Sequence, residues 1–251
     1  MEIINEIIKN EKEYIDNYSL NDDYELSRVS NIKTTEIVRD LLLEIDPFGV
    51  WLDLFINARK TAHIIYINDL DDERLIKYEK ILGITGLKNL DNTCINIDNT
   101  ESFVFLNYEG NIRDIVFTMH EIIHYITARM DDVTKLSPVI REFPSIFYEL
   151  YTLNYLKQLG YSENELKSIY NKRIYETYNS LNMTEKLGID NTSYTPYVVG
   201  EYLARNALIK TKEDEQLLPM IKYMTENLSK TNLEDIYYLI NYNNKKKKLS
   251  R

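Results

Sequence analysis

Two of the three histidines in this 251-residue chain lie four positions apart, at His120 and His124, and Glu121 directly follows the first. Residues four apart on an α-helix lie one above the other on the same face, so both imidazoles can bind one Zn²⁺ ion. Glu121 projects beside them, where its carboxylate can take a proton from a metal-bound water. The spacing therefore indicates a zinc site that activates water.

Most residues around this motif are apolar, so the helix that carries it should be buried. A buried imidazole or carboxylate without a partner is costly, and a metal ion would provide that partner. The alternative interpretation is that His120 and His124 are core histidines with ordinary hydrogen bonds and that Glu121 faces solvent.

A catalytic zinc ion takes three protein ligands and leaves one position open, so a third ligand must come from elsewhere in the chain. Glu142 and Glu149 are the best candidates, because they lie two helical turns apart and share one face of a predicted helix. One carboxylate would bind the metal, and the other would accept the free ring N–H of a ligating histidine. His63 lies in an apolar run and is interpreted as a core residue, and Asp131 and Asp132 as exposed turn residues.

These segments resemble a known enzyme family. Residues 105–126, FLNYEGNIRDIVFTMHEIIHYI, and residues 142–149, EFPSIFYE, are similar to the catalytic core of the oligoendopeptidase F and thimet oligopeptidase family of zinc metallopeptidases. In that family, LNYxGxxRDVxTxxHExGH is followed by ExPS or ExAS and by a second Glu seven residues on. The resemblance implies that His120, His124 and Glu142 bind zinc and that Glu121 is the general base. It also implies that Glu149 contacts one of the ligands without binding the metal itself.

A later segment, SYTPYVVGEYLARNA at residues 193–207, resembles more loosely the tyrosine-rich stretch that faces the zinc in this family. Tyr194, Tyr197 and Tyr202 are therefore candidates to donate a phenol O–H to the oxyanion that forms during hydrolysis. The alternative for each is a packing role, because the chain contains 21 tyrosines.

The chain departs from the family in three ways. Ile123 stands where the family usually has glycine before the second histidine, and no histidine remains in the last third of the chain. Family members are also considerably longer, with an N-terminal helical half that closes over the cleft. Without that half, the substrate size limit could be relaxed, a partner chain could complete the cleft, or catalysis could be lost.

Scarce glycine and proline, 7 and 5 residues, favour long helices. We expect helices from Glu2 to Tyr18, from a cap at Thr34-Thr35, from about residue 111 to Met130, and from Ser137-Pro138 towards Leu159. Ser162 with Glu165 and Thr231 with Glu234 are capping-box signals for later helices. Strands are expected at residues 63–67, 93–97 and 103–106.

The predicted fold is mostly α within the α+β class: a helical, zincin-like catalytic domain with a small sheet beside the HExxH helix. We expect a single metallopeptidase-like domain over residues 1–251, with N-terminal helices in 1–60, the sheet in 61–110 and a helical catalytic part in 111–251. The edge of the strand at 103–106 could pair with an extended peptide substrate.

Composition excludes several other functions. Lys and Arg number 30 against 40 Asp and Glu, and the net charge of −10 disfavours broad binding to nucleic acid or anionic membranes. We expect no signal peptide, because the first 18 residues have neither a basic leader nor a continuous apolar core, and no apolar run approaches the length of a membrane span. Its one cysteine, Cys94, fits a reducing compartment, and we expect a cytoplasmic protein.

The sequence thus predicts a zinc-dependent peptidase. Two imidazoles and one carboxylate suit Zn²⁺, although Mn²⁺, Co²⁺ or Fe²⁺ could use the same ligands. One alternative is a catalytically silent zinc-binding or peptide-binding interaction protein. Another is a different HExxH peptidase that acts on a folded protein.

Overall fold

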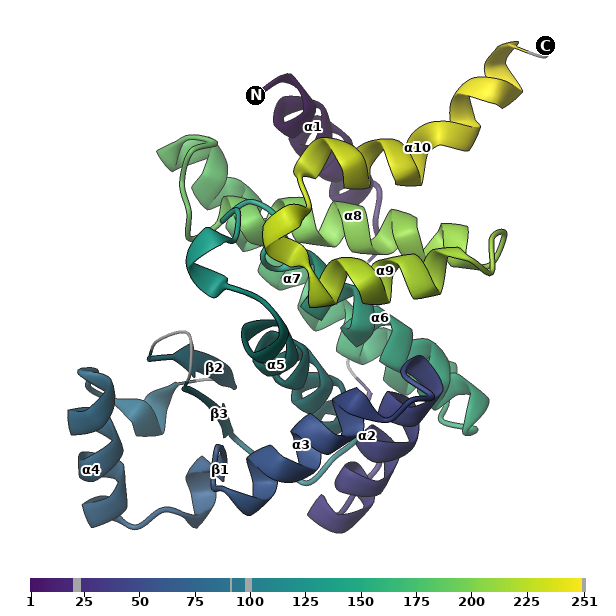
Figure 1. Cartoon of the computed structure of the whole chain (residues 1–251). Coiled ribbons are helices and arrows are strands. Elements are labelled where there is room, and N and C mark those ends of the chain that lie inside the picture. The colour runs from purple at the N-terminus through teal and green to yellow at the C-terminus, as the bar shows by residue number, and fades with distance from the viewer. Residues whose placement is uncertain (20–23, 91, 98–100, 250–251) are drawn as a thin grey trace. The chain divides into compact units, whose positions relative to one another are not determined.

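The computed structural model describes residues 1–19, 24–90, 92–97 and 101–249, the last eight in backbone only. Ten α-helices and a three-stranded sheet make up the regular structure of this part of the chain, and 68% of the chain is helical, which confirms the predicted fold class (Figure 1). Internal contacts divide the chain into two compact units, one of Met1–Glu25 with Lys135–Arg251 and one of Leu26–Thr134. That the chain acts as a single domain stays a prediction.

The second unit contains four helices: α2 (Asn31–Ile45), α3 (Val50–Lys60), α4 (Asp72–Leu82) and α5 (Arg113–Met130). The start predicted for α2 was wrong, because Ser30 caps this helix and its Oγ accepts a hydrogen bond from the backbone N–H of Lys33. Thr34 lies inside the helix and is buried. A serine accepting from the third residue of the helix satisfies one of the free N–H groups there, so the helix begins one turn before the predicted cap.

The sheet of this unit comprises β1 (Ile64–Tyr66), β2 (Thr93–Asn96) and β3 (Ser102–Leu106). Its strand order is β1-β3-β2, with β1 parallel and β2 antiparallel to β3. The sheet lies between α4 and α5, and β2 and β3 both contact α5, which confirms the predicted place of the sheet beside the HExxH helix (Figure 1). The expectation that β3 offers an edge to a peptide was wrong, because both of its edges are already paired. β2 is an edge strand instead.

The first unit is a bundle of α1 (Glu2–Asp16), α6 (Phe143–Gln158), α7 (Glu163–Leu187), α8 (Thr195–Thr211), α9 (Leu217–Glu226) and α10 (Leu233–Leu249). Helix α8 is central and contacts the other five (Figure 1). Its most extensive packing is against α6. Short 3₁₀ turns elsewhere in the chain cover Ile67–Asp69, Leu87–Asn89, Val133–Lys135 and Leu228–Lys230.

The starts of helices α7 and α6 test two of the capping predictions made from the sequence. The capping box of Ser162 and Glu165 is present at the start of α7 and confirms that prediction. The predicted start at Ser137-Pro138 was wrong, because Pro144 lacks an N–H and would interrupt such a helix, so α6 begins at Phe143 with Pro144 in its first turn.

The cap of α10 lies one residue later than predicted. Asn232 accepts a hydrogen bond from the backbone N–H of Asp235 at 2.9 Å and donates its side-chain N–H to the Asp235 carboxylate at 2.6 Å. This reciprocal pair takes the place of the predicted pair of Thr231 and Glu234. In the described part of the chain, no helix combines the length and the apolar composition that crossing a bilayer needs.

Candidate metal centre

Helix α5 presents both histidines of the HExxH motif. His120 is 8% exposed and His124 is half-buried, and their ring centroids are 4.9 Å apart at an interplanar angle of 73°. Glu121, in the same turn as His120, is 7% exposed. The helix is buried on nearly all sides by apolar residues, as its sequence predicts.

Glu142 immediately precedes helix α6 and is 4% exposed. Its carbonyl oxygen accepts a hydrogen bond from the Ile146 backbone N–H at 3.0 Å, the first bond of the helix. The Arg141 guanidinium donates from Nε to the Glu142 Oε1 at 3.2 Å. A carboxylate at a helix N-terminus is also stabilised by the positive end of the helix dipole.

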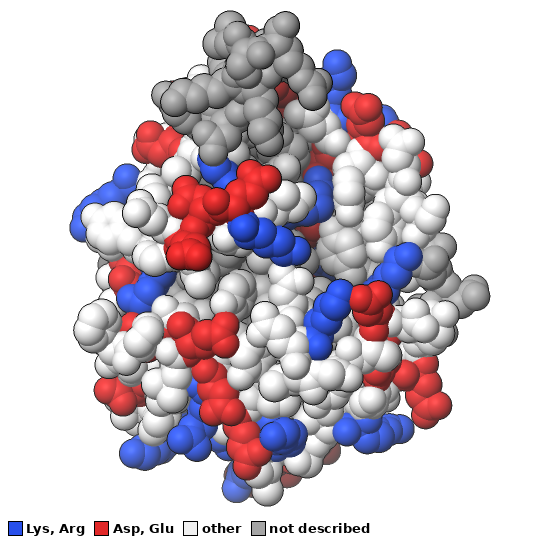
Figure 2. All heavy atoms as spheres, turned by 90° about the vertical axis from the view of Figure 1, so that its right-hand side faces the viewer, with Lys and Arg blue, Asp and Glu red and all other residues white. Residues whose placement is uncertain are grey.

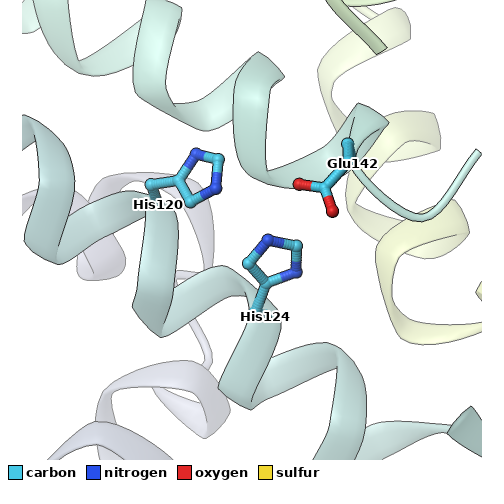
Figure 3. A group of neighbouring side chains, drawn as sticks. All are labelled: His120, His124 and Glu142. Atoms are coloured by element: carbon cyan, nitrogen blue, oxygen red, sulfur yellow. The ribbon is translucent and has the colours of Figure 1, made fainter. Parts of the chain in front are cut away.

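His120, His124 and Glu142 each offer one ligand atom, and these three atoms all lie within 4.8 Å of one another. Figure 3 shows the two rings and the carboxylate pointing toward one another. Two imidazoles and one carboxylate are the protein ligands that a catalytic zinc ion takes, with its fourth position left open for water. The donor set and its spacing therefore fit a divalent metal ion, and it is the ligand set that the family resemblance implies.

Glu121 lies within electrostatic reach of the edge strand β2. Burial raises the pKa of the Cys94 thiol, on β2, well above its ordinary value, and the Glu121 carboxylate raises it further. Cys94 is therefore a protonated thiol at neutral pH. Helix α5, which carries Glu121, packs against β2.

The loop before α5 is held by one buried carboxylate. Asp114 accepts hydrogen bonds from three backbone N–H groups, those of Glu109 at 3.0 Å, Gly110 at 2.7 Å and Asn111 at 3.0 Å. Burial raises the pKa of Asp114 above its usual value, and these three hydrogen bonds partly offset that rise. Backbone bonding between Val29 and Gly110 at 3.0 Å fixes the loop further. The start of α5, two turns before His120, is thus firmly placed.

Glu149, the residue predicted to support a ligating histidine, is 2% exposed. Its Oε2 lies 3.8 Å from Nη1 of Arg173 on α7, and the Arg173 Nε donates to Oε2 of Glu201 on α8 at 3.0 Å. A bond from Glu149 to a histidine stays a prediction. Sequence reasoning missed Arg173, although it lies at helical spacing on the buried stripe of α7 with Leu166 and Ile169.

The ionic network continues from α8 to the N-terminal helix. Arg205 binds both oxygens of Glu11 on α1, from Nη1 at 2.8 Å and from Nη2 at 2.5 Å, and its Nη1 lies 3.7 Å from Glu201. The Tyr170 phenol donates to Glu201 at 3.3 Å. Burial raises the pKa of Glu11, an effect that the Arg205 guanidinium opposes. Charged groups thus join α1, α6, α7 and α8 inside the first unit.

The three candidate tyrosines occupy different environments. Tyr194 precedes α8 and is half-buried, and its backbone N–H donates to Asn191 at 3.1 Å. Tyr197 is half-buried in the first turn of α8. The ring of Tyr202 is 7% exposed and stacks on Tyr237 of α10, with centroids 6.4 Å apart. That stacking gives Tyr202 a packing role, and a role for any of the three in catalysis stays a prediction.

The remaining titratable candidates lie outside the group of three. His63 is near the end of the sheet, where its Nδ1 and the Thr61 hydroxyl are 2.6 Å apart and its ring stacks on Phe103. Asp131 is the C-cap of α5, and the Asp132 carboxylate accepts from Thr134 in the following turn. His63 is half-buried, so it is not the core residue that was expected, and Asp131 and Asp132 are half-buried and not exposed.

No family model and no curated protein matches the sequence. The fold is similar to a crystal structure of a protein assigned as an oligoendopeptidase F from Bacillus anthracis strain Ames, with a TM-score of 0.60 and 12% identity. The match covers 95% of this chain and 49% of that chain. It supports the family resemblance at the level of the fold, and the chain spans about half the length of that protein.

Proposed function

We propose that the protein is a zinc-dependent peptidase, with His120, His124 and Glu142 as the metal ligands. The observation that carries the proposal is the convergence of two imidazoles and one carboxylate, the three ligand atoms lying within 4.8 Å of one another. The peptidase fold of the structural neighbour supports it. Zinc bound by such ligands polarises a carbonyl group and lowers the pKa of water towards about 7.

The residues of this chain would move the proton. Glu121 would accept it from the attacking water and pass it to the leaving amine. Glu121 is 7% exposed and directly follows the proposed ligand His120, so its carboxylate lies near the proposed metal site and has little contact with solvent. Tyr194, Tyr197 or Tyr202 would donate to the oxyanion, and Glu149 would support a ligating histidine from behind.

The edge strand β2 would bind the main chain of the substrate. Among the described residues, β2 pairs only with β3, and it packs against α5, the helix that carries Glu121. An extended peptide added to this edge would bind through backbone hydrogen bonds, which gives affinity with little preference for side chains. We therefore propose a peptide substrate in place of nucleic acid or membrane lipid. On the face drawn in Figure 2, acidic and basic side chains are interspersed, as suits neither of those two ligands.

The alternative to this proposal is a catalytically silent zinc-binding or peptide-binding protein, which would share the metal ligands and lack peptide turnover. We further propose a cytoplasmic location, since one cysteine cannot form an internal disulfide, which suits a reducing compartment.

Elemental analysis of the purified protein tests the proposal. We expect about one zinc per chain in the wild type, a large loss in Glu142→Ala, and no loss in Glu36→Ala, a control at a carboxylate whose side chain is 51% exposed. Little zinc in the wild type after zinc is offered would contradict the proposal. Zinc without cleavage of any peptide in a broad library would favour the silent binding protein.

A further inference from the structure

Gly200 lies in the interior of helix α8, where its backbone does not adopt the positive φ that favours glycine. A glycine inside a helix costs about 0.5–1 kcal/mol relative to alanine, so some other feature must account for it. Close approach of a neighbouring element is the usual alternative. The neighbour here is the first turn of α6, which begins directly after Glu142.

A Cβ atom at Gly200 would collide with that turn. It would lie 2.8 Å from Cδ1 of Ile146, 3.1 Å from Cβ of Glu142 and 3.2 Å from the Glu142 carbonyl carbon. The Ile146 methyl ends a flexible side chain and can rotate away. The two Glu142 atoms cannot move without shifting the whole residue, and both contacts are tighter than nine in ten Cβ contacts in proteins. Glu142 would therefore have to move by a few tenths of an ångström.

Helix α8 is poorly placed to retreat from such a collision. Glu201, the next residue, is fully buried and accepts a hydrogen bond from Arg173 at 3.0 Å. One turn later, Arg205 binds both oxygens of Glu11. Moving α8 would stretch these buried ion pairs, which lose stability steeply when they separate. The displacement would fall on Glu142.

We propose that Gly200 is a positioning residue for the metal ligand Glu142, an inference that rests on the proposed zinc site. Zinc binds a carboxylate oxygen at about 2.0–2.2 Å, and ligand distances in working sites stay within about 0.2 Å of such values. The shift of a few tenths of an ångström that a side chain at position 200 imposes on Glu142 would change where its carboxylate lies relative to the two imidazoles. The absence of a side chain at Gly200 thus allows Glu142, the third proposed ligand, to occupy its position next to α8.

The test measures zinc affinity by competition with a chelator. We expect Gly200→Ala to weaken zinc binding about tenfold, the lower end of the effect of losing a supporting contact around a metal site. Gly200→Ala with Ile146→Val, compared with Ile146→Val alone, should show the same weakening. This pair removes the methyl 2.8 Å away and keeps both Glu142 contacts, so it also serves if the single variant does not fold.

Two controls separate positioning from general damage. Ala207→Val overpacks another fully buried position of α8, and we expect lower thermal stability of the zinc-free protein with unchanged zinc affinity. In a Glu142→Ala background, Gly200→Ala should leave the residual zinc affinity unchanged, because the ligand it displaces is gone.

Equal zinc affinity with and without the Gly200 substitution would overturn the inference, as would a similar loss in Ala207→Val. Absence of zinc binding in the wild type would instead refute the proposed function, so the two failures are distinguishable.

Discussion

Glu121 is the residue whose chemistry can be isolated most cleanly, because it is buried beside His120 and is not one of the three proposed ligands. Replacing it with Gln keeps its size and removes its basicity. We expect Glu121→Gln to retain zinc and to lower peptide turnover about 10²–10⁴-fold, the usual contribution of a general base. The measurement is turnover of a library peptide alongside zinc content.

The matched control is Glu36→Gln, at an exposed carboxylate on α2, which should leave both values unchanged. Undiminished turnover by a zinc-replete Glu121→Gln protein would remove Glu121 from the mechanism.

At the scale of residues, the sequence indicated the candidate metal ligands but not the residues on other helices that pack next to them. His120 and His124 could be predicted because helical spacing places two histidines four residues apart on one face. Spacing left Glu142 and Glu149 open as the third ligand, and the family resemblance implied Glu142, whose carboxylate lies near the two imidazoles. Gly200 and Arg173 could not be predicted, because their roles depend on which helices meet, and Gly200 lies 58 positions after Glu142 in the sequence. Gly200 did leave one signal, a glycine within a helical pattern.

At the scale of elements, the buried ionic network holds α6, α7 and α8 together. We expect Arg173→Met to destabilise the protein by about 3–5 kcal/mol, because it leaves the buried carboxylates of Glu149 and Glu201 without their shared guanidinium. Urea unfolding measures the loss. The control, Lys12→Met, breaks a pair with Glu185 in which both side chains are more than 40% exposed, and it should cause no comparable change. An equal loss in both variants would contradict a special role for the network.

The loop before α5 gives a prediction that depends on pH. Because burial raises the folded-state pKa of Asp114, its contribution to stability is greatest below the ordinary value of 3.8 and falls as pH rises through the raised pKa. Asp114→Asn lacks this titration and also loses acceptors for backbone N–H groups, at a cost of about 2–3 kcal/mol.

We therefore expect Asp114→Asn to be the less stable protein in urea at both pH 4.5 and pH 7, with the smaller difference from wild type at pH 7. A difference that widens towards pH 7 would contradict the raised pKa.

Helix starts could be predicted where the signal lies within a few neighbouring residues. Strand order could not, because it depends on pairing between strands that are distant in the sequence. Capping at Ser162 and Glu165 is decided within four residues and was confirmed. The order β1-β3-β2 places β3 in the centre only because β1 pairs with it in parallel, across a connection that includes α4. The sequence of residues 103–106 contains no sign of the pairing with β1, so the peptide-binding edge was assigned to β3, which is the central strand.

For the whole molecule, metal binding should appear as added stability. An ion that binds only the folded state at 100 times its dissociation constant adds about 2.7 kcal/mol. For a chain of this length that corresponds to a rise in Tm of roughly 5–10 °C. We expect this rise on adding zinc to chelator-treated wild type, and a much smaller rise for Glu142→Ala. Equal rises in the two proteins would show that zinc acts elsewhere.

The discontinuous first unit bears on synthesis of the chain. Glu11 on α1 is fully buried, yet its partner Arg205 follows 194 residues later, and the whole second unit, residues 26–134, is translated between them. A contiguous unit can form its contacts as it leaves the ribosome, whereas α1 must wait for α8. The nascent helix therefore exposes its apolar face and an unneutralised glutamate through most of translation, and we expect it to be the segment that chaperones protect.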